Sequence, residues 1–150
     1  DYWIPGRLRV QVEFIEKHPQ YSMIYGKVFS LRSDGLLVKT KANYRSGNIF
    51  NELYLQKFCI PASTIMLKRE VFLKLGGYDE SLVLEDFDMW LRVASSEKIG
   101  FIDKYISVYR AGREDSLHVS KLGQVLKDKQ KIIKKWETKP KHSSRLDNLL

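Results

Sequence analysis

The spacing of apolar residues predicts a helix near the start of the chain. Residues 5–18 carry Leu8, Val12 and Ile15 at helical spacing, and these three side chains form the apolar stripe of an amphipathic helix. Proline at position 5 suits a first helical turn, since its φ angle is already helical. A proline directly after residue 18 ends the pattern.

Beyond residue 18 the pattern alternates between strands and helices. The predicted elements are a strand over residues 22–31, a turn at 33–35, a second hairpin strand over 36–39, a loop over 40–48, a short helix over 49–58, a buried strand over 60–67, a helix over 69–75 closed by Gly76 and Gly77, a helix over 85–94, an edge strand or hairpin over 99–109, and a last helix over 119–137. This succession predicts an α/β fold whose mixed sheet is flanked by helices.

Composition adds that the chain is an ordinary globular one. Its 150 residues are 43% hydrophobic and 29% charged, which fits one compact domain and excludes disorder. No apolar run approaches the roughly 18 residues of a membrane-spanning helix. Cys59 is the single cysteine, so no intrachain disulfide can form, and we expect it to fill space in the core of a protein from a reducing compartment.

Charge is concentrated at the C-terminal end. The net charge is +8, and residues 119–150 contribute nine Lys or Arg against three Asp or Glu. The predicted helix over 119–137 is therefore basic and amphipathic. Such a segment could meet an anionic membrane surface, another anionic partner, or only solvent, and charge alone does not choose among these.

The clearest candidate chemistry is a pair of adjacent carboxylates, Glu85 and Asp86, in the first turn of a predicted helix. A helix N-terminus favours their ionised form, which suits a general base or a metal contact. Acids are common at helix starts, so helix capping alone is the competing interpretation.

Several motifs in a fixed order carry more information than this pair. They are DYWIPGRL at residues 1–8, GGYDE at 76–80, EDFDMWLR at 85–92 and YR at 109–110. Together they resemble the C-terminal, acceptor-side half of family 2 glycosyltransferases of GT-A fold, over residues 1–118. Residues 119–150 then form a basic helical extension. The fold expected from the resemblance is a partial GT-A domain.

The resemblance implies an inverting transfer of sugar from a nucleotide-diphospho-sugar to an acceptor hydroxyl. Asp86, with Glu85 beside it, matches the Glu-Asp pair whose Asp deprotonates the acceptor. A sugar hydroxyl is a weak nucleophile, so a carboxylate within hydrogen-bond reach is needed to accept its proton.

The resemblance also implies a divalent cation, Mg²⁺ or Mn²⁺, which would neutralise charge on the departing diphosphate. Asp1 matches the end of the family's Asp-x-Asp type motif and is a candidate ligand. His118 lies where some GT-A enzymes have a further ligand, although a surface histidine without a metal is the competing interpretation.

Four other side chains have open interpretations. Arg110, in the closing Tyr-Arg motif, could hold diphosphate oxygens, brace the turn at Glu85, or form a structural ion pair. Trp3 and Trp90 could stack on sugar rings or belong to the core, and the neighbours of Trp90 favour the core. We expect Arg92 to pair with an acid.

The resemblance carries expectations about the whole protein. No Gln-x-x-Arg-Trp motif of the processive family members is present, so we expect single sugar additions. A nucleotide-binding half would precede Asp1, and this piece alone would be inactive and could self-associate through exposed sheet surface. Its acceptor would be a saccharide or a lipid-linked sugar, and its place the cytoplasm, at the inner face of a membrane.

A second hypothesis is a non-catalytic basic binding module. The lysine-rich helix over 119–137 would then dock on a membrane surface or another anionic partner. No nucleic-acid motif, zinc spacing or interleaving of aromatic and basic residues supports a nucleic-acid partner.

Overall fold

The computed structural model describes residues 1–112 and 121–137. Its five strands form one mixed sheet with the order β1-β5-β2-β3, and β4 also pairs with β2. The strands are β1 (Tyr2–Trp3), β2 (Met23–Leu31), β3 (Leu37–Lys39), β4 (Met66–Leu67) and β5 (Ile99–Arg110). Among the strand pairs in the described residues, only β2–β5 is parallel, and the long connection between these two strands supplies the crossover that such a pair requires.

The centre of the sheet is the β2–β5 ladder, which runs from Met23 opposite Ile99 to Leu31 opposite Arg110. The predicted strand over 22–31 and its hairpin with 36–39 are confirmed. The prediction of an edge position for residues 99–109 is wrong. Tyr2 pairs with Val108, so the beginning of the chain covers the outer edge of β5.

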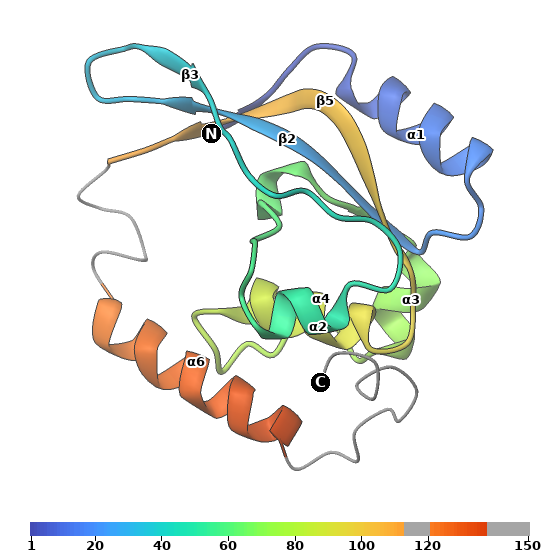
Figure 1. Cartoon of the computed structure of the whole chain (residues 1–150), viewed down its shortest axis with the longest axis vertical. Helices are drawn as coiled ribbons and strands as arrows, with labels where there is room; N and C mark the ends of the chain where they lie inside the picture. The colour runs from blue at the N-terminus through green and yellow to red at the C-terminus, as the bar shows by residue number, and fades with distance from the viewer. Residues whose placement is uncertain (113–120, 138–150) are drawn as a thin grey trace, which may run out of the picture.

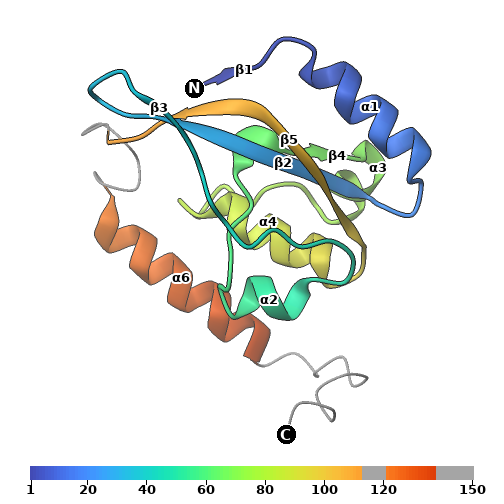
Figure 2. The same ribbon diagram turned by 45° about the horizontal axis from the view of Figure 1, so that its top comes forward.

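Helices cover both faces of the sheet (Figures 1 and 2). They are α1 (Arg7–Lys17), α2 (Phe50–Tyr54), α3 (Arg69–Lys74), α4 (Glu85–Ala94) and α6 (Leu122–Glu137), with a 3-10 turn, η1, at Ala62–Thr64. Helix α1 lies on one face, and α2, α4 and α6 lie on the other. The main core fills the space on the second face, between Met23 and Tyr25 of β2, Leu53 of α2, Trp90 of α4 and Ile132 of α6.

The fully buried residues of helix α1 are polar, whereas two residues of its predicted apolar stripe are exposed. Leu8 is 53% exposed and Val12 is 42% exposed, although an apolar stripe ordinarily faces a core. Arg7 and Gln11 are buried instead, because their side chains donate hydrogen bonds to backbone carbonyls of residues 63–65. Helix α1 therefore covers the turn at residues 63–65 and supplies hydrogen-bond donors to its backbone carbonyls.

That turn corrects the prediction of a continuous strand over residues 60–67. Only Met66 and Leu67 form a strand, because Pro61 begins η1 and the Thr64 hydroxyl closes the turn by donating to the Pro61 carbonyl at 2.8 Å. Cys59, expected in the core, is exposed just before this turn, so that prediction is wrong as well.

Helix α6 belongs to the same core as the sheet. Ile132 is buried, and the Trp136 ring lies edge-on to Phe50 of α2, with ring centroids 5.0 Å apart. The predicted helix over 119–137 is confirmed from Leu122 onward, while residues 113–120, 138–150 and the predicted boundary at 118 lie outside the described part of the chain.

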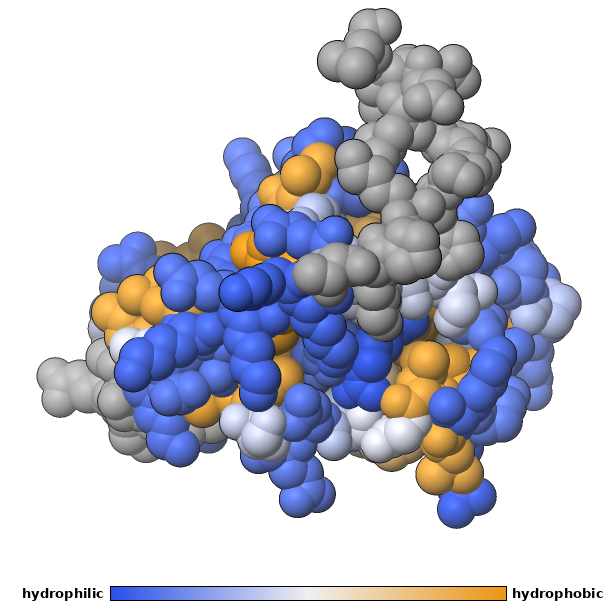
Figure 3. Space-filling view, turned by 90° about the horizontal axis from the view of Figure 1, so that it is seen from below, coloured by the Kyte–Doolittle hydropathy of each residue, from blue (hydrophilic) through white to orange (hydrophobic). Residues whose placement is uncertain are grey.

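The apolar side of α6 is therefore mostly used in packing. Leu122 and Leu126 remain exposed. Seen from below, the surface of the molecule is largely hydrophilic with separate apolar patches (Figure 3). Among the described helices, none has the length and apolar character to cross a bilayer.

Candidate functional site

The first turn of α4 places the two predicted catalytic carboxylates, Glu85 and Asp86, at a half-buried helix N-terminus. Asp86 Oδ1 accepts the backbone N–H of Phe87 at 2.6 Å. No side chain caps the helix at Leu84, the residue before it. Both carboxylates therefore lie at the electropositive N-terminal end of α4.

Two further side chains gather at this turn, and the four residues Cys59, Tyr78, Glu85 and Asp86 are called the Asp86 cluster below. Burial raises the pKa of the Tyr78 hydroxyl, and the charges of Asp86 and Glu85 raise it further. The Cys59 residue is exposed, yet protein encloses part of its thiol, and this partial desolvation raises the pKa of the thiol, with a second contribution from Asp86. Asp86 therefore acts electrostatically on both groups.

Glycine places Tyr78 beside α4. Gly76 and Gly77 have φ angles of 82° and 72°, which glycine adopts without strain, and they end α3 and turn the chain back. Tyr78 then rests edge-on against Phe72 of α3 and Trp90 of α4. Its ring bridges the two helices.

The loop after Tyr78 is closed by Asp79. Its Oδ1 accepts the Ser81 hydroxyl at 2.6 Å and the Ser81 backbone N–H at 3.1 Å. These bonds from Ser81 lower the pKa of the Asp79 carboxyl. The GGYDE motif thus forms a hydrogen-bonded turn in the loop that precedes α4.

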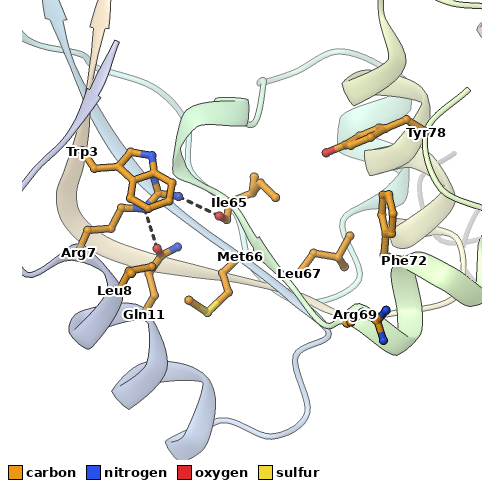
Figure 4. A pocket seen from close by; sticks show the side chains of 10 residues that line it. All are labelled: Trp3, Arg7, Leu8, Gln11, Ile65, Met66, Leu67, Arg69, Phe72 and Tyr78. Carbon is orange, nitrogen blue, oxygen red and sulfur yellow. Dashed lines mark hydrogen bonds between the residues drawn. The ribbon is translucent and has the colours of Figure 1, made fainter. Parts of the chain in front are cut away.

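A pocket of about 420 Å³ runs along β4 and ends at Tyr78. Its lining residues are Trp3, Arg7, Leu8, Gln11, Ile65, Met66, Leu67, Arg69, Phe72 and Tyr78. Trp3 and Arg7 form one end, Phe72 and Tyr78 form the other, and β4 lies between them (Figure 4). The wall is mainly apolar, so polar recognition is confined to the two ends.

The two predicted tryptophans differ in accessibility. Trp3 is 57% exposed at the pocket, and the Arg7 guanidinium lies 4.1 Å from its ring centroid. Burial lowers the pKa of Arg7. Trp90 is only 2% exposed, so it is a core residue and offers no open face to a sugar.

The remaining predicted site residues lie at the β1–β5 end of the sheet or outside the described residues. Asp1 accepts the backbone N–H of Arg110 at 2.9 Å, and both side chains are exposed. His118 lies outside the described residues. Within residues 1–112 and 121–137, no three His, Cys, Asp or Glu side chains form a group that could hold a metal ion.

Arg92 pairs with an acid, as predicted. Its Nε lies 2.7 Å from Oδ2 of Asp88, which is fully buried, and Lys135 of α6 approaches Oδ1 of the same carboxylate at 2.9 Å. The four-residue spacing of Asp88 and Arg92 was a readable signal for the first contact. No local pattern indicates the second, which joins residues far apart in sequence.

The comparisons with known proteins show the family to which the chain belongs. A model of the family described as glycosyltransferase like family 2 matches residues 8–109, and the chain belongs to that family. The observed fold, a mixed sheet flanked by helices, confirms the predicted class and is consistent with a partial GT-A glycosyltransferase domain.

Three curated relatives are also glycosyltransferases. An uncharacterized glycosyltransferase of Methanocaldococcus jannaschii is 25% identical over 120 residues, covering 77% of this chain and 41% of the relative. The O-antigen biosynthesis glycosyltransferase WbnJ of Escherichia coli is 29% identical over 93 residues, covering 62% of this chain and 36% of the relative. The amylovoran biosynthesis glycosyltransferase AmsE of Erwinia amylovora is 23% identical over 95 residues, covering 63% of this chain and 35% of the relative. The chain thus spans about two fifths of these relatives or less.

Proposed function

We propose that this chain is the acceptor-side part of an inverting, nucleotide-sugar-dependent glycosyltransferase in which Asp86 is the general base. Family membership and the relatives support glycosyl transfer. The observation that carries the finer proposal is the position of Asp86: a half-buried carboxylate at the start of α4, beside Tyr78 at the end of the pocket.

The chemistry follows from that position. An acceptor hydroxyl at the Tyr78 end of the pocket gives its proton to Asp86 as its oxygen bonds to the anomeric carbon. The bond from that carbon to the nucleoside diphosphate breaks on the opposite face, so the configuration inverts. The Glu85 carboxylate adds a second negative charge near Asp86, which favours transfer of the proton to this site.

Substrate contacts are assigned to the exposed predicted residues. Trp3 presents its ring to a sugar, and Arg110 offers a guanidinium to the donor diphosphate. Two relatives are named for O-antigen and amylovoran biosynthesis, which supports a saccharide or lipid-linked acceptor in polysaccharide biosynthesis.

A divalent cation, Mg²⁺ or Mn²⁺, remains part of the proposal, with Asp1 as a candidate ligand and His118 as a second. The described residues do not by themselves make a metal site, so no step is derived through the ion. Chelation with EDTA followed by addition of Mg²⁺ or Mn²⁺ tests the requirement. Unchanged transfer after chelation would remove the cation from the proposal.

The decisive experiment on the base is Asp86→Asn, assayed for sugar transfer in the active enzyme. We expect a loss of at least about 10²-fold because the hydroxyl then has no proton acceptor. Glu80→Gln is the matched control, since Glu80 is an exposed acid near the same loop. Equal activity of both variants, with folding verified by circular dichroism, would exclude Asp86 as the base.

The second candidate, a basic module docking on a membrane, is favoured by the net charge of +8 and the lysines of α6. It is compatible with an enzyme placed in the cytoplasm at the inner membrane face. Pelleting with liposomes of increasing anionic lipid content tests it, and light scattering of the same sample tests self-association. Binding that does not depend on anionic lipid would reject this docking mode.

A further inference from the structure

Helix α6 lies beyond the residues that match the family model, which end at 109, yet it contacts the start of α4. We propose that α6 positions the Asp86 cluster, and that Asp128 is the positioning residue. The inference rests on the proposed function of Asp86. It assigns α6 a part in the site that neither the basic character of the helix nor the family match indicates.

The first contact places a carboxylate at the N-terminus of α4. Asp128, only 2% exposed, accepts the backbone N–H of Val83 at 2.6 Å through Oδ2, while its Oδ1 accepts the Gln124 amide at 2.7 Å. Burial raises the pKa of Asp128, but hydrogen bonds from Val83, Gln124 and the Leu84 backbone outweigh it and hold that pKa low. Asp128 therefore anchors the backbone at Val83 and Leu84, the two residues that lead into α4.

The second contact lies two helical turns further along α6. Lys135 approaches Asp88 in the first turn of α4, and Ile132, between the two contact residues in sequence, is buried in the core. Residues seven apart lie on one face of a helix. Helix α6 thus holds the start of α4 at two points on either side of Glu85 and Asp86 in sequence.

This arrangement fixes the geometry on which the base depends. Val83 lies three residues before Asp86, so a shift of its backbone moves Asp86 relative to Tyr78 and Cys59. Displacements of about 1 Å at a reacting group are enough to lower rates by about 10²-fold. The contacts of α6 accordingly act through Asp86 and touch no substrate themselves.

Cys59 provides a built-in reporter of this geometry because it is the only cysteine and Asp86 raises its pKa. The rate of alkylation by iodoacetamide is measured against pH on the full 150-residue chain. The pH at which this rate is half-maximal is the midpoint of the thiol titration, called the midpoint below. Asp86→Asn calibrates the shift that follows from complete loss of the charge. Asp128→Ala should move the midpoint in the same direction, by at least half of that calibrated shift.

Two variants separate position from charge. Asp128→Asn keeps an acceptor for the Val83 N–H, since the exposed Gln124 can rotate, so it should retain the wild-type midpoint. Lys127→Gln, an exposed change on the same helix, is the control. A midpoint of Asp128→Ala equal to wild type, or an Asp128→Asn shift as large as that of Asp128→Ala, would overturn the proposal.

Lys135→Met covers the case in which Asp128→Ala does not fold. It should shift the midpoint in the same direction by loosening the second contact, and an unchanged midpoint there would then overturn the proposal. In the active enzyme, Asp128→Ala should lower kcat about 10-fold or more with the donor KM within twofold, and Asp128→Asn should restore kcat. If the Asp86→Asn enzyme still transfers sugar, the proposal that Asp86 is the general base is refuted. If the Asp86→Asn enzyme is inactive but Asp128→Ala leaves kcat unchanged, only the proposed role of α6 is refuted.

Discussion

Helices α4 and α1 lie on opposite faces of one sheet and bury opposite kinds of side chain. On α4 the buried residues are mainly apolar, with Asp88 as the buried charge. On α1 the buried residues are Arg7 and Gln11, and the apolar Leu8 and Val12 are exposed.

The difference comes from what each helix faces. Helix α4 packs on the side chains of β2 and α2, so apolar groups are stabilised there by leaving water. Helix α1 faces carbonyl groups of residues 63–65, and a buried carbonyl without a donor is unfavourable. The partner surface, not the amphipathic pattern, decides which side of a helix turns inward.

The largest effect should come from the buried charge of α4. Replacing Asp88 with Ala leaves Arg92 and Lys135 without their shared carboxylate, and we expect a loss of about 3 to 5 kcal/mol in the free energy of unfolding, measured by urea denaturation. Asp103→Asn is the control, because the Asp103 side chain pairs with Lys27 at the surface, where solvent screens the pair and it contributes little to stability. Equal losses would mean that the Asp88 network does not anchor α4.

The next effect should come from the polar side of α1. Arg7→Met removes the donors that reach the carbonyls of residues 63 and 65, and should lower the free energy of unfolding by about 1 to 3 kcal/mol. Arg9→Met changes an exposed arginine on the same helix and should be nearly neutral. If both variants unfold at the same urea concentration, the inward face of α1 is not held by its hydrogen bonds.

The two helices should differ in their response to acid. The pKa of Asp128 is below its ordinary value of about 3.9, so its stabilising contribution is complete above that value and is lost as pH falls through the folded-state pKa. Amide exchange near Val83 and along α4 should therefore rise in strong acid before that of α1, whose polar contacts to residues 63–65 involve no carboxylate. Asp128→Asn should have a shallower acid dependence of stability. Acid exchange that begins in α1 would contradict this order.

The smallest effect should come from the exposed apolar side of α1. Val12→Ala should change stability by no more than about 0.5 kcal/mol, since its side chain is 42% exposed to water and is not part of the core cluster. Val93→Ala on α4 removes fully buried methyl groups and should lower stability by about 2 kcal/mol. Comparable values in thermal unfolding would show that Val12 is covered in solution.

The sequence predicted elements well where local chemistry decides them. Helix α4 begins with acids and continues with apolar residues at helical spacing, and the structure has it over Glu85–Ala94 as predicted. Strand β2 and the hairpin were equally readable. The failures at residues 60–67, at Cys59 and at the edge of β5 depend on contacts from remote parts of the chain, which one sequence does not reveal.

The candidate site divides in the same way. The motif around Glu85 and Asp86 located the carboxylate pair, and the GGYDE motif contains Tyr78. Nothing local indicates that Asp128 reaches Val83, or that Trp90 lies in the core while Trp3 remains open. Motifs identify the reacting groups, and tertiary contacts determine how they are held.

The pairing of residue 2 with residue 108, and of β2 with β5, also sets an order of events during synthesis. Ribosomes add about 5 to 20 residues per second, so β1 and β2 emerge several seconds before the strand that joins them. Until then both strands expose unpaired edges, which are prone to aggregation. Because the β1–β5 and β2–β5 pairs join residues far apart in sequence, this part of the sheet should form slowly, and the nascent chain should gain from a chaperone that shields these edges until β5 emerges.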